Sequence, residues 1–236
     1  MRALGAGLLA LLGLPRVPEA AGLSAAAREA FEDFTRAHVD PPGTSDRVEP
    51  PGRVTDYLWW LAVNREVLFH GSPREDLREL RTDRETGDST AYGRQQAVFA
   101  TDDPVWAMWF ALMPRGEDLR STRNGVWSVR VDSRSRYFFS VDSDLPDGEL
   151  LTDGWMYVLP RHGFTREPAL ARVLQSGQWV SPDPVRPLAH FAVTPADFPL
   201  AAVVGRHTEG DSMLKTLRAA RTAFRRSTRG SAQAEG

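Results

Sequence analysis

Two short stretches of the chain carry residues that could do chemistry. Residues 67–73 form an apolar, β-rich run that delivers a histidine into a Gly-Ser-Pro turn. This pattern puts an imidazole at the end of a strand, and binding residues concentrate where rigid elements meet loops. Residues 97–107 are typical of a strand that turns into a helix. Together the two stretches predict strand ends that are placed to bind a ligand.

A third strand-like run, residues 177–181, contains Gln178. Each candidate residue also has an ordinary structural interpretation. His70 could be a surface or partly buried histidine, Phe99 could belong to the core, and Gln178 could lie on an edge strand without a function. Tyr92, in the polar loop 75–96, could simply be solvated. These alternatives stay open at the level of the sequence.

The helices and strands that must position these residues can be predicted from hydrophobic periodicity and from capping and turn residues. Ser24 is a helix N-cap signal, and Ala27, Phe31 and Phe34 recur at helical spacing after it, so a helix is expected over residues 24–38. Further helices are expected over residues 55–63 and 104–112, the second with Trp106, Trp109 and Phe110 on its packed face. Strands are expected over residues 67–70, 98–101, 125–131, 155–160, 177–181 and 190–193, with another beginning at Tyr137. Short strands in the middle of the chain with helices around them predict an α+β fold with a mixed or antiparallel β core.

The chain divides into three expected segments. Residues 40–51 are rich in Pro, Gly, Ser and Asp, which predicts a helical and linker segment over residues 1–50 and a main domain over residues 51–205. Residues 3–14 form an apolar run of the size found in signal peptides, too short to span a bilayer. A cytoplasmic protein is expected, or a secreted one if residues 1–22 act as a signal peptide.

Residues 206–236 predict a basic C-terminal helix and tail. The apolar residues Met213, Leu214, Leu217, Ala220 and Phe224 recur near helical spacing. Residues 213–229 also carry six positive charges, which are Lys215, Arg218, Arg221, Arg225, Arg226 and Arg229. We expect this amphipathic helix to dock onto the core. The alternative is an anionic partner, either lipid or nucleic acid.

Composition excludes several classes of function. The chain has 236 residues, 42% of them hydrophobic and 25% charged, with a net charge of −2 and no cysteine. Disulfides, thiolate metal sites and a cysteine nucleophile are therefore excluded, and the charge argues against nonspecific nucleic-acid binding by the whole surface. His162, His190 and His207 lack metal-ligand spacing, and no phosphate loop or Gly-x-Ser-x-Gly elbow is present. The acidic residues of segment 142–153 are expected to form a solvated turn rather than a cation site.

The order of the three motifs resembles the ADP-ribosyltransferase superfamily, the fold of poly(ADP-ribose) polymerases and diphtheria-type toxins. The matching motifs are His70-Gly71-Ser72, then Phe99 before the expected helix 104–112, then Gln178-Trp179-Val180. Locally the chain is most similar to rifamycin-type ADP-ribosyltransferases, in His-Gly-Ser, in Ala91-Tyr92-Gly93-Arg94 and in the Thr-x-Asp-x-x-x-Ala turn that starts at Thr101. The resemblance covers residues 65–195.

The resemblance implies an enzyme that uses NAD as a substrate, releases nicotinamide and transfers ADP-ribose to an acceptor. The acceptor could be a protein, a nucleic acid or a small molecule. His70 and Gln178 stand at positions of the family's catalytic residues, with His70 on the adenosine ribose and Gln178 where a carboxylate contacts the nicotinamide ribose. Gly71 and Ser72 match neighbours of the carboxamide. Phe99 stands in place of a tyrosine that stacks on nicotinamide, and Tyr92 could be an alternative stacker.

Two positions depart from the pattern of the most active members. Phe99 keeps the stacking face of the tyrosine but lacks its hydroxyl. Gln178 can hydrogen-bond a ribose hydroxyl but carries no charge and cannot act as a base. A noncatalytic module that binds NAD or ADP-ribose is therefore the first alternative. A relative of the RNA 2′-phosphotransferases is the second, with Arg94, Arg161 and Arg186 as its candidate phosphate ligands.

Overall fold

The computed structural model describes residues 13–17, 22–41, 46–83, 92–114, 116–129, 132–169 and 174–234. The expectations for residues 1–12, for Ala91 and for the end of the tail at residues 235–236 fall outside these ranges. Within them lie four α-helices, which are α2 (Ala25–His38), α3 (Val54–Asn64), α4 (Pro104–Leu112) and α5 (Met213–Ala234). Three one-turn helices, Asp147–Glu149, Pro195–Asp197 and Ala201–Val203, connect strands or lead into them.

Eleven described strands form two sheets. The larger sheet runs in the order β1 (Asp46–Arg47), β10 (Ala189–Val193), β6 (Gly154–Pro160), β2 (Val67–Ser72), β3 (Val98–Thr101), β9 (Gln178–Ser181), β7 (Thr165–Arg166). The smaller sheet runs in the order β11 (Gly205–Arg206), β5 (Asp132–Ser143), β4 (Leu119–Val129), β8 (Leu174–Gln175). The pairs β1–β10 and β11–β5 are parallel and the other pairs are antiparallel. The expected α+β fold with a mixed β core is confirmed.

Helix boundaries follow the capping residues. The Ser24 Oγ accepts a hydrogen bond from the Ala27 N–H at 3.1 Å, which confirms Ser24 as the N-cap of α2. Asp103 caps α4 in the same way, with its Oδ1 accepting from the Trp106 N–H at 3.0 Å, and Pro104 takes the first helical position. Both helices therefore start where sequence signals place them.

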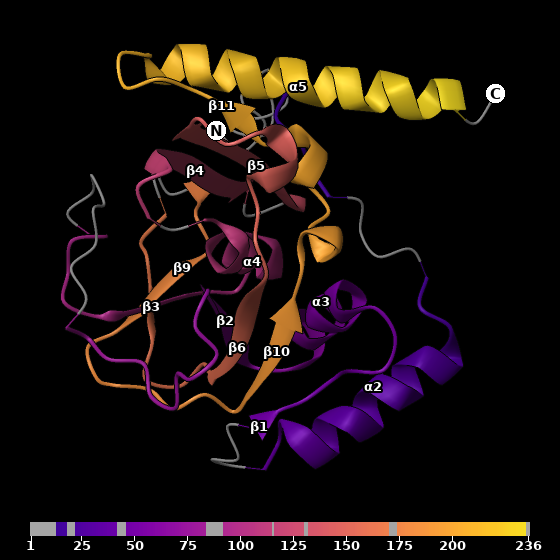
Figure 1. The fold of residues 1–236 in the computed structure, drawn as a ribbon. Helices are drawn as coiled ribbons and strands as arrows, with labels where there is room; N and C mark the ends of the chain where they lie inside the picture. The colour runs from indigo at the N-terminus through magenta and orange to yellow at the C-terminus, as the bar shows by residue number, and fades with distance from the viewer. Residues whose placement is uncertain are drawn as a thin grey trace.

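Helix α4 lies between the two sheets (Figure 1). On one side it packs on β2 and β6 at Gly71 and Gly154, where an added Cβ would stand 1.9 Å from the Ala107 carbonyl oxygen and 2.1 Å from that of Ala111. On the other side the Trp109 ring stacks on Phe139 of β5 with centroids 4.8 Å apart. Trp109 is fully buried, and Trp106 and Phe110 pack partly buried against the same core, as expected.

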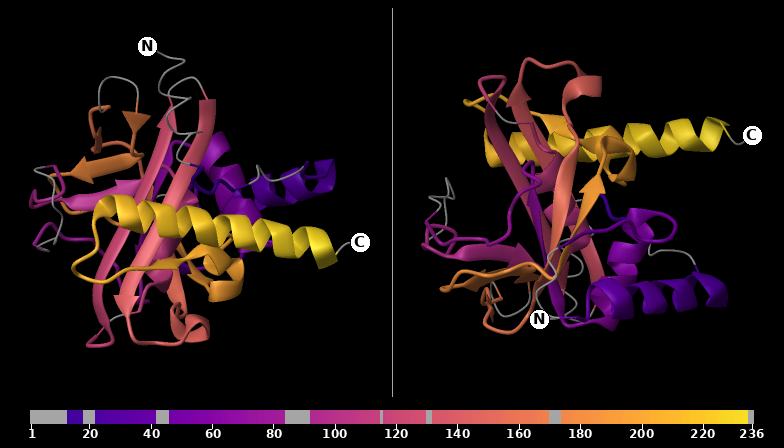
Figure 2. Two further views of the ribbon diagram at one scale, coloured as in Figure 1. Left: turned by 90° about the horizontal axis from the view of Figure 1, so that it is seen from above. Right: turned by 60° about the horizontal axis from the view of Figure 1, so that its bottom comes forward.

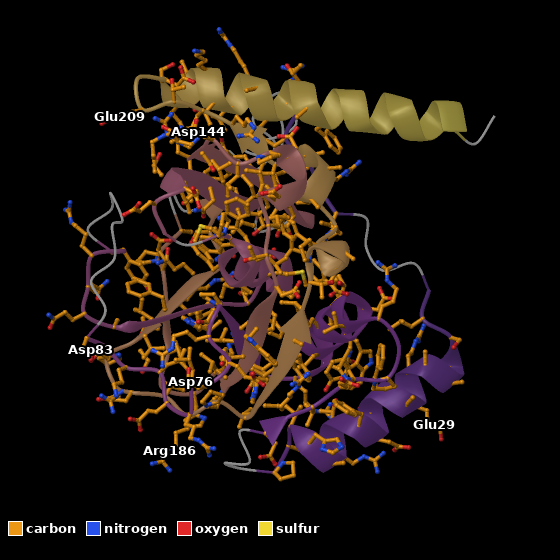
Figure 3. The ribbon with its side chains drawn as sticks, in the orientation of Figure 1. Glu29, Asp76, Asp83, Asp144, Arg186 and Glu209 are labelled. Carbon is orange, nitrogen blue, oxygen red and sulfur yellow. The ribbon has the colours of Figure 1, made fainter. Side chains whose placement is uncertain are left out.

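The opposite face of the large sheet has a smaller core of its own. It contains Leu68 of β2, Ala100 of β3 and Trp179 of β9, together with Leu80 from the loop that follows β2. Leu80 forms an isolated β-bridge with Val185, so two loops close over this face. Figure 3 shows Asp76 and Arg186, one from each loop, at the same end of the molecule.

The N-terminal and C-terminal segments both pack on the main body. Phe31 of α2 contacts Tyr57 of α3 edge to face, with ring centroids 5.2 Å apart, and β1 extends the large sheet. Ala220 of α5 forms a third core cluster with Leu14 and Phe138, and Leu217 and Phe224 pack partly buried against the core. Met213 and Leu214, which were expected on the same apolar face, are exposed, so only part of that face docks. Figure 2 shows α5 crossing the β4–β5 hairpin and continuing past it. Among the described helices, none has the length and hydrophobicity that a membrane span requires.

The contact of α4 with β6 leads to a first prediction. Gly154→Ala should lower the free energy of unfolding by about 2 kcal/mol, because the new methyl group would overlap helix backbone that cannot move independently. Gly148→Ala is the matched control, since a Cβ there meets nothing within 4 Å. Urea denaturation of both variants measures the difference. Equal stabilities would contradict the close approach of α4 to the sheet.

Candidate functional site

The three strands that carry the sequence motifs are consecutive neighbours in the large sheet. β2 with His70 pairs with β3 with Phe99, and β3 pairs with β9 with Gln178. Residues 70, 99 and 178 are far apart in the sequence, so only this strand order brings them into one region. The three motif residues therefore lie on three adjacent strands of one sheet.

Pairing between β2 and β3 is unusually short. Between these two described strands only Phe69 and Thr101 are paired, although the register would next place Gly71 opposite Phe99. β6 by contrast pairs with β2 over its whole length, to Ser72. The end of β2 thus has a strand partner on one side only, and such an edge offers backbone donors and acceptors to a ligand.

His70 spans the point where this pairing stops. Its Nδ1 lies 2.8 Å from the Phe99 carbonyl oxygen. Because a carbonyl oxygen can only accept, Nδ1 carries the proton and donates, and in the neutral ring Nε2 is then the acceptor nitrogen. The hydrogen bond fixes both the tautomer and the orientation of the ring. An imidazole held in this way suits a hydroxyl donor such as that of a ribose.

The pleat of the sheet separates the candidate side chains into two groups. Gly71 faces α4, so His70 projects from the opposite face of β2. Phe99 and Gln178 lie on the α4 face, because the pairs Phe69–Thr101 and Thr101–Gln178 put them in register with Phe69. A ligand that contacts all three must therefore lie at the break between β2 and β3.

Phe99 and Gln178 are diagonal neighbours on β3 and β9, a placement in which side chains are within reach of each other. Both are partly exposed. Phe99 belongs to none of the three core clusters in the described part of the chain. Partial burial of Phe99 leaves both interpretations from the sequence open, a packed side chain and a ring that stacks on a ligand.

A tight turn before β9 sets the position of Gln178. Gly177 has a positive φ of 75°, and its carbonyl oxygen accepts from the Asp102 N–H at 3.2 Å. Asp102 in turn forms an ion pair with Arg166 of β7 at 2.9 Å. These contacts tie the turn to the end of β3 on one side and to β7 on the other.

Gly71 and Ser72 each have a structural role in addition to the one that the resemblance implies. The close approach of Ala107 in α4 accounts for a glycine at position 71. Ser72 is buried, and its Oγ accepts from the Arg74 N–H at 3.2 Å, which closes the turn after β2. Their backbone groups remain at the edge where pairing with β3 has ended.

Tyr92 contacts β7, the edge strand next to β9. Its hydroxyl donates to the Thr165 carbonyl oxygen of β7 at 2.8 Å. Burial raises the pKa of Tyr92 to about 12, and the negative charge of Glu167 adds to the shift. The tyrosine is thus anchored beside β7 and β9 rather than extended into solvent.

Glu167 is a residue of this region that sequence reasoning missed. Its backbone N–H donates to the Gln178 carbonyl oxygen at 2.9 Å, and its carboxylate accepts from the Ser176 hydroxyl. No short motif marks it, because it follows a two-residue strand that is itself hard to predict. The signal that could have found it is the strand pairing, which brings a carboxylate next to Gln178.

The candidate phosphate-binding arginines come from three different loops. Arg161 forms an ion pair with Glu66 at 3.9 Å, and Arg186 forms one with Glu79 at 3.6 Å. Arg94 lies exposed in the turn before β3. Two of the three arginines are therefore already paired with carboxylates.

The acidic residues of segment 142–153 begin within β5. Asp142 is a buried residue of that strand, which differs from the solvated turn expected for the whole segment. Asp142 and Asp144 both form ion pairs with Arg120, at 2.7 and 2.6 Å, and Asp147 forms one with Arg206 at 2.8 Å. Within the described ranges, no three His, Asp or Glu side chains are grouped so that they could hold a metal ion.

Comparisons with known proteins found no relative of this chain. The chain matches no family model, and no curated protein or solved structure shows significant similarity to it. The assignment of a function therefore depends on the residues and on the geometry described above.

The buried carboxylate of Asp103 lies between the end of β3 and the start of α4. The Oδ2 of Asp103 accepts from the Tyr137 hydroxyl of β5 at 2.6 Å, while its Oδ1 caps α4. Burial raises the pKa of Asp103 above its usual range, and the hydrogen bond from Tyr137 opposes that shift. Burial and the charge of Asp103 likewise raise the pKa of Tyr137. This contact joins the two sheets next to the candidate site.

The raised pKa of Asp103 leads to a second prediction. Protonation of Asp103 favours the folded state, so this contribution to stability is complete below the unfolded pKa and is lost as pH rises through the folded pKa. Tyr137→Phe removes a donor to the charged form and should cost about 2 kcal/mol at a pH above the raised pKa of Asp103. The cost should shrink as the solution is acidified through the raised pKa.

Urea denaturation at a series of pH values on both sides of the raised pKa of Asp103 measures this dependence. Asp103→Asn keeps an acceptor for the Trp106 N–H but cannot ionise, so the cost of Tyr137→Phe in that background should no longer vary with pH. A cost that is equally pH-independent in both backgrounds would show that the charge of Asp103 is not involved.

Proposed function

We propose that this protein is an NAD-dependent ADP-ribosyltransferase-like enzyme. One observation carries the proposal. The His70 imidazole is fixed by the Phe99 carbonyl oxygen at the point where the pairing of β2 and β3 stops. Two of the three motif strands are joined there by a side chain, and the third motif residue, Gln178, lies on the next strand.

The proposed arrangement gives each residue a role. Nε2 of His70 accepts a hydrogen bond from a hydroxyl of the adenosine ribose. The backbone at Gly71 and Ser72, which lacks a partner strand on the β3 side, binds the carboxamide. Phe99 stacks on the nicotinamide ring, and the Gln178 amide binds the nicotinamide ribose.

The proposed reaction breaks the bond between the ring nitrogen of nicotinamide and C1′ of its ribose. The bonding electron pair leaves with nicotinamide, and positive charge develops on the ribose. A nucleophile then attacks C1′ and loses its proton, so the products are nicotinamide, the ADP-ribosylated acceptor and H⁺. With water as the acceptor, the product is free ADP-ribose.

A noncatalytic NAD- or ADP-ribose-binding module is the second candidate. The observation that favours it is the residue type at position 178, because an amide supplies no charge to the developing cation. NAD binding without nicotinamide release would distinguish this module from the enzyme. The RNA 2′-phosphotransferase alternative has less support, because its three candidate arginines occupy separate loops.

The role of His70 gives a third prediction. His70→Ala should weaken NAD binding about fivefold or more, because it removes a directional hydrogen bond worth about 1 kcal/mol. Titration calorimetry on folded protein measures the change. His162→Ala, in the exposed turn after β6, is the control and should bind NAD like the parent. Unchanged affinity in His70→Ala, or no binding by the parent protein, would remove the proposed role.

Gln178 decides between enzyme and binding module and gives a fourth prediction. Gln178→Glu adds a negative charge at nearly constant volume, and a well-placed electrostatic contact contributes about 2–4 kcal/mol in a transition state. Nicotinamide release should therefore rise at least about tenfold even with partial placement. Gln178→Ala should lose the activity of the parent.

The matched control is Gln175→Glu, which adds the same charge in β8 of the other sheet. Release of nicotinamide from NAD is measured for all four proteins at matched folding, judged by circular dichroism. Equal rates across the Gln178 series would favour the binding module.

A further inference from the structure

We propose that Glu167 supplies the negative charge that position 178 lacks, and that it is a catalytic residue of the site. The inference rests on the proposed function, since it names the group that would stabilise the nicotinamide ribose cation. The neighbouring ends of β9 and β7 carry different side chains. β9 begins with an uncharged amide, and the chain directly beside it carries a carboxylate.

The backbone places Glu167 opposite Gln178. The β7–β9 register pairs Arg166 with Trp179, and the hydrogen bond from the Glu167 N–H to the Gln178 carbonyl oxygen, 2.9 Å, continues this ladder by one residue. Residues opposite each other in an antiparallel pair share a face, with Cβ atoms about 5 Å apart. Glu167 therefore lies on the same sheet face as Gln178 and Phe99.

The carboxylate of Glu167 is held in place by a neutral group. It accepts a hydrogen bond from the Ser176 hydroxyl, and the Ser176 Oγ in turn accepts from the Gln178 N–H at 3.2 Å. Among the ion pairs between described residues, none includes Glu167. Within the part of the chain that the structure describes, the carboxylate is thus oriented by a neutral hydroxyl rather than by an ion pair.

The neighbouring arginine does not cancel this charge. Arg166 lies on the opposite face, where its guanidinium binds Asp102 at 2.9 Å and lies over the Trp179 ring at 5.5 Å from the centroid. Partial burial of Glu167 strengthens its field at the site, because the effective dielectric constant there is lower than in water. Its charge also acts on the Tyr92 hydroxyl at the same edge.

Atoms and charges balance in the proposed step. As the bond between nicotinamide and C1′ breaks, its electron pair goes to nicotinamide, and the Glu167 carboxylate stabilises the cation left on the ribose. The acceptor nucleophile then forms its bond to C1′, and Glu167 takes the proton that the nucleophile loses. The Gln178 amide orients the ribose hydroxyl during both events.

The test is a double-mutant cycle on the full chain, with release of nicotinamide from NAD as the rate and calorimetric NAD affinity as a second measurement. Glu167→Gln should lower the rate about a hundredfold in the parent, because the variant keeps the size of the side chain but removes its charge. NAD affinity should change by less than about twofold, since the charge acts mainly on the transition state. Glu209→Gln, on the exposed segment next to α5 labelled in Figure 3, is the matched control.

The second arm of the cycle repeats Glu167→Gln in the Gln178→Glu background. A carboxylate at position 178 would take over the role of Glu167, so the effect of Glu167→Gln should fall to less than about tenfold there. A purely structural role of Glu167 would give the same loss in both backgrounds, together with weaker NAD binding. That result would overturn the inference.

The outcomes also separate this inference from the proposed function. If Gln178→Glu releases nicotinamide and Glu167→Gln leaves the parent rate unchanged, the assignment of Glu167 is wrong and the enzyme proposal stands. If neither the parent nor Gln178→Glu releases nicotinamide, the enzyme proposal fails and Glu167 has no catalytic role. Glu167→Asp, which keeps the charge but shortens the side chain, should retain more activity than Glu167→Gln.

Discussion

The close approach of α4 to β2 and β6 is the constraint on which the candidate site depends. Two glycines on adjacent strands, Gly71 and Gly154, allow the backbone of the helix to touch the sheet. On its other side α4 stacks Trp109 on Phe139, so one short helix fixes the distance between the two sheets. Because α4 begins directly after β3, its position also determines where β3 ends. The capping residue Asp103, bound to Tyr137, completes this connection.

With β3 tied to α4, and β2 paired to β6 over its whole length, the two strands diverge after one pair. A backbone carbonyl near such a break needs another donor, and His70 provides it at Phe99. The same interaction therefore satisfies the backbone and orients an imidazole. A buried structural histidine would serve the first purpose alone. His70 and Phe99 are both partly exposed, as the proposed binding role requires.

Much of the fold could be predicted from the sequence, because the relevant signals are local. The capping residue Ser24 predicted the start of α2, and apolar runs predicted α4 and the strands β2, β3 and β6. The α+β class followed from the order of these elements. Strands of two residues, such as β1 and β7, carry too little pattern to be predicted and form only through pairing. The face of each candidate side chain depends on strand register, which no local motif encodes.

Strand register also explains why the sequence motifs contained no negative charge beside Gln178. Neighbouring residues of a strand point to opposite faces, so Arg166 and Glu167 are divided by the edge strand although they are adjacent in the chain. The arginine binds Asp102 behind the turn at Gly177, and this contact holds the strand end against β9. The carboxylate remains on the side of Phe99 and Gln178, held by a neutral serine hydroxyl. An edge strand can therefore add a negative charge to a site whose central strand provides only an amide.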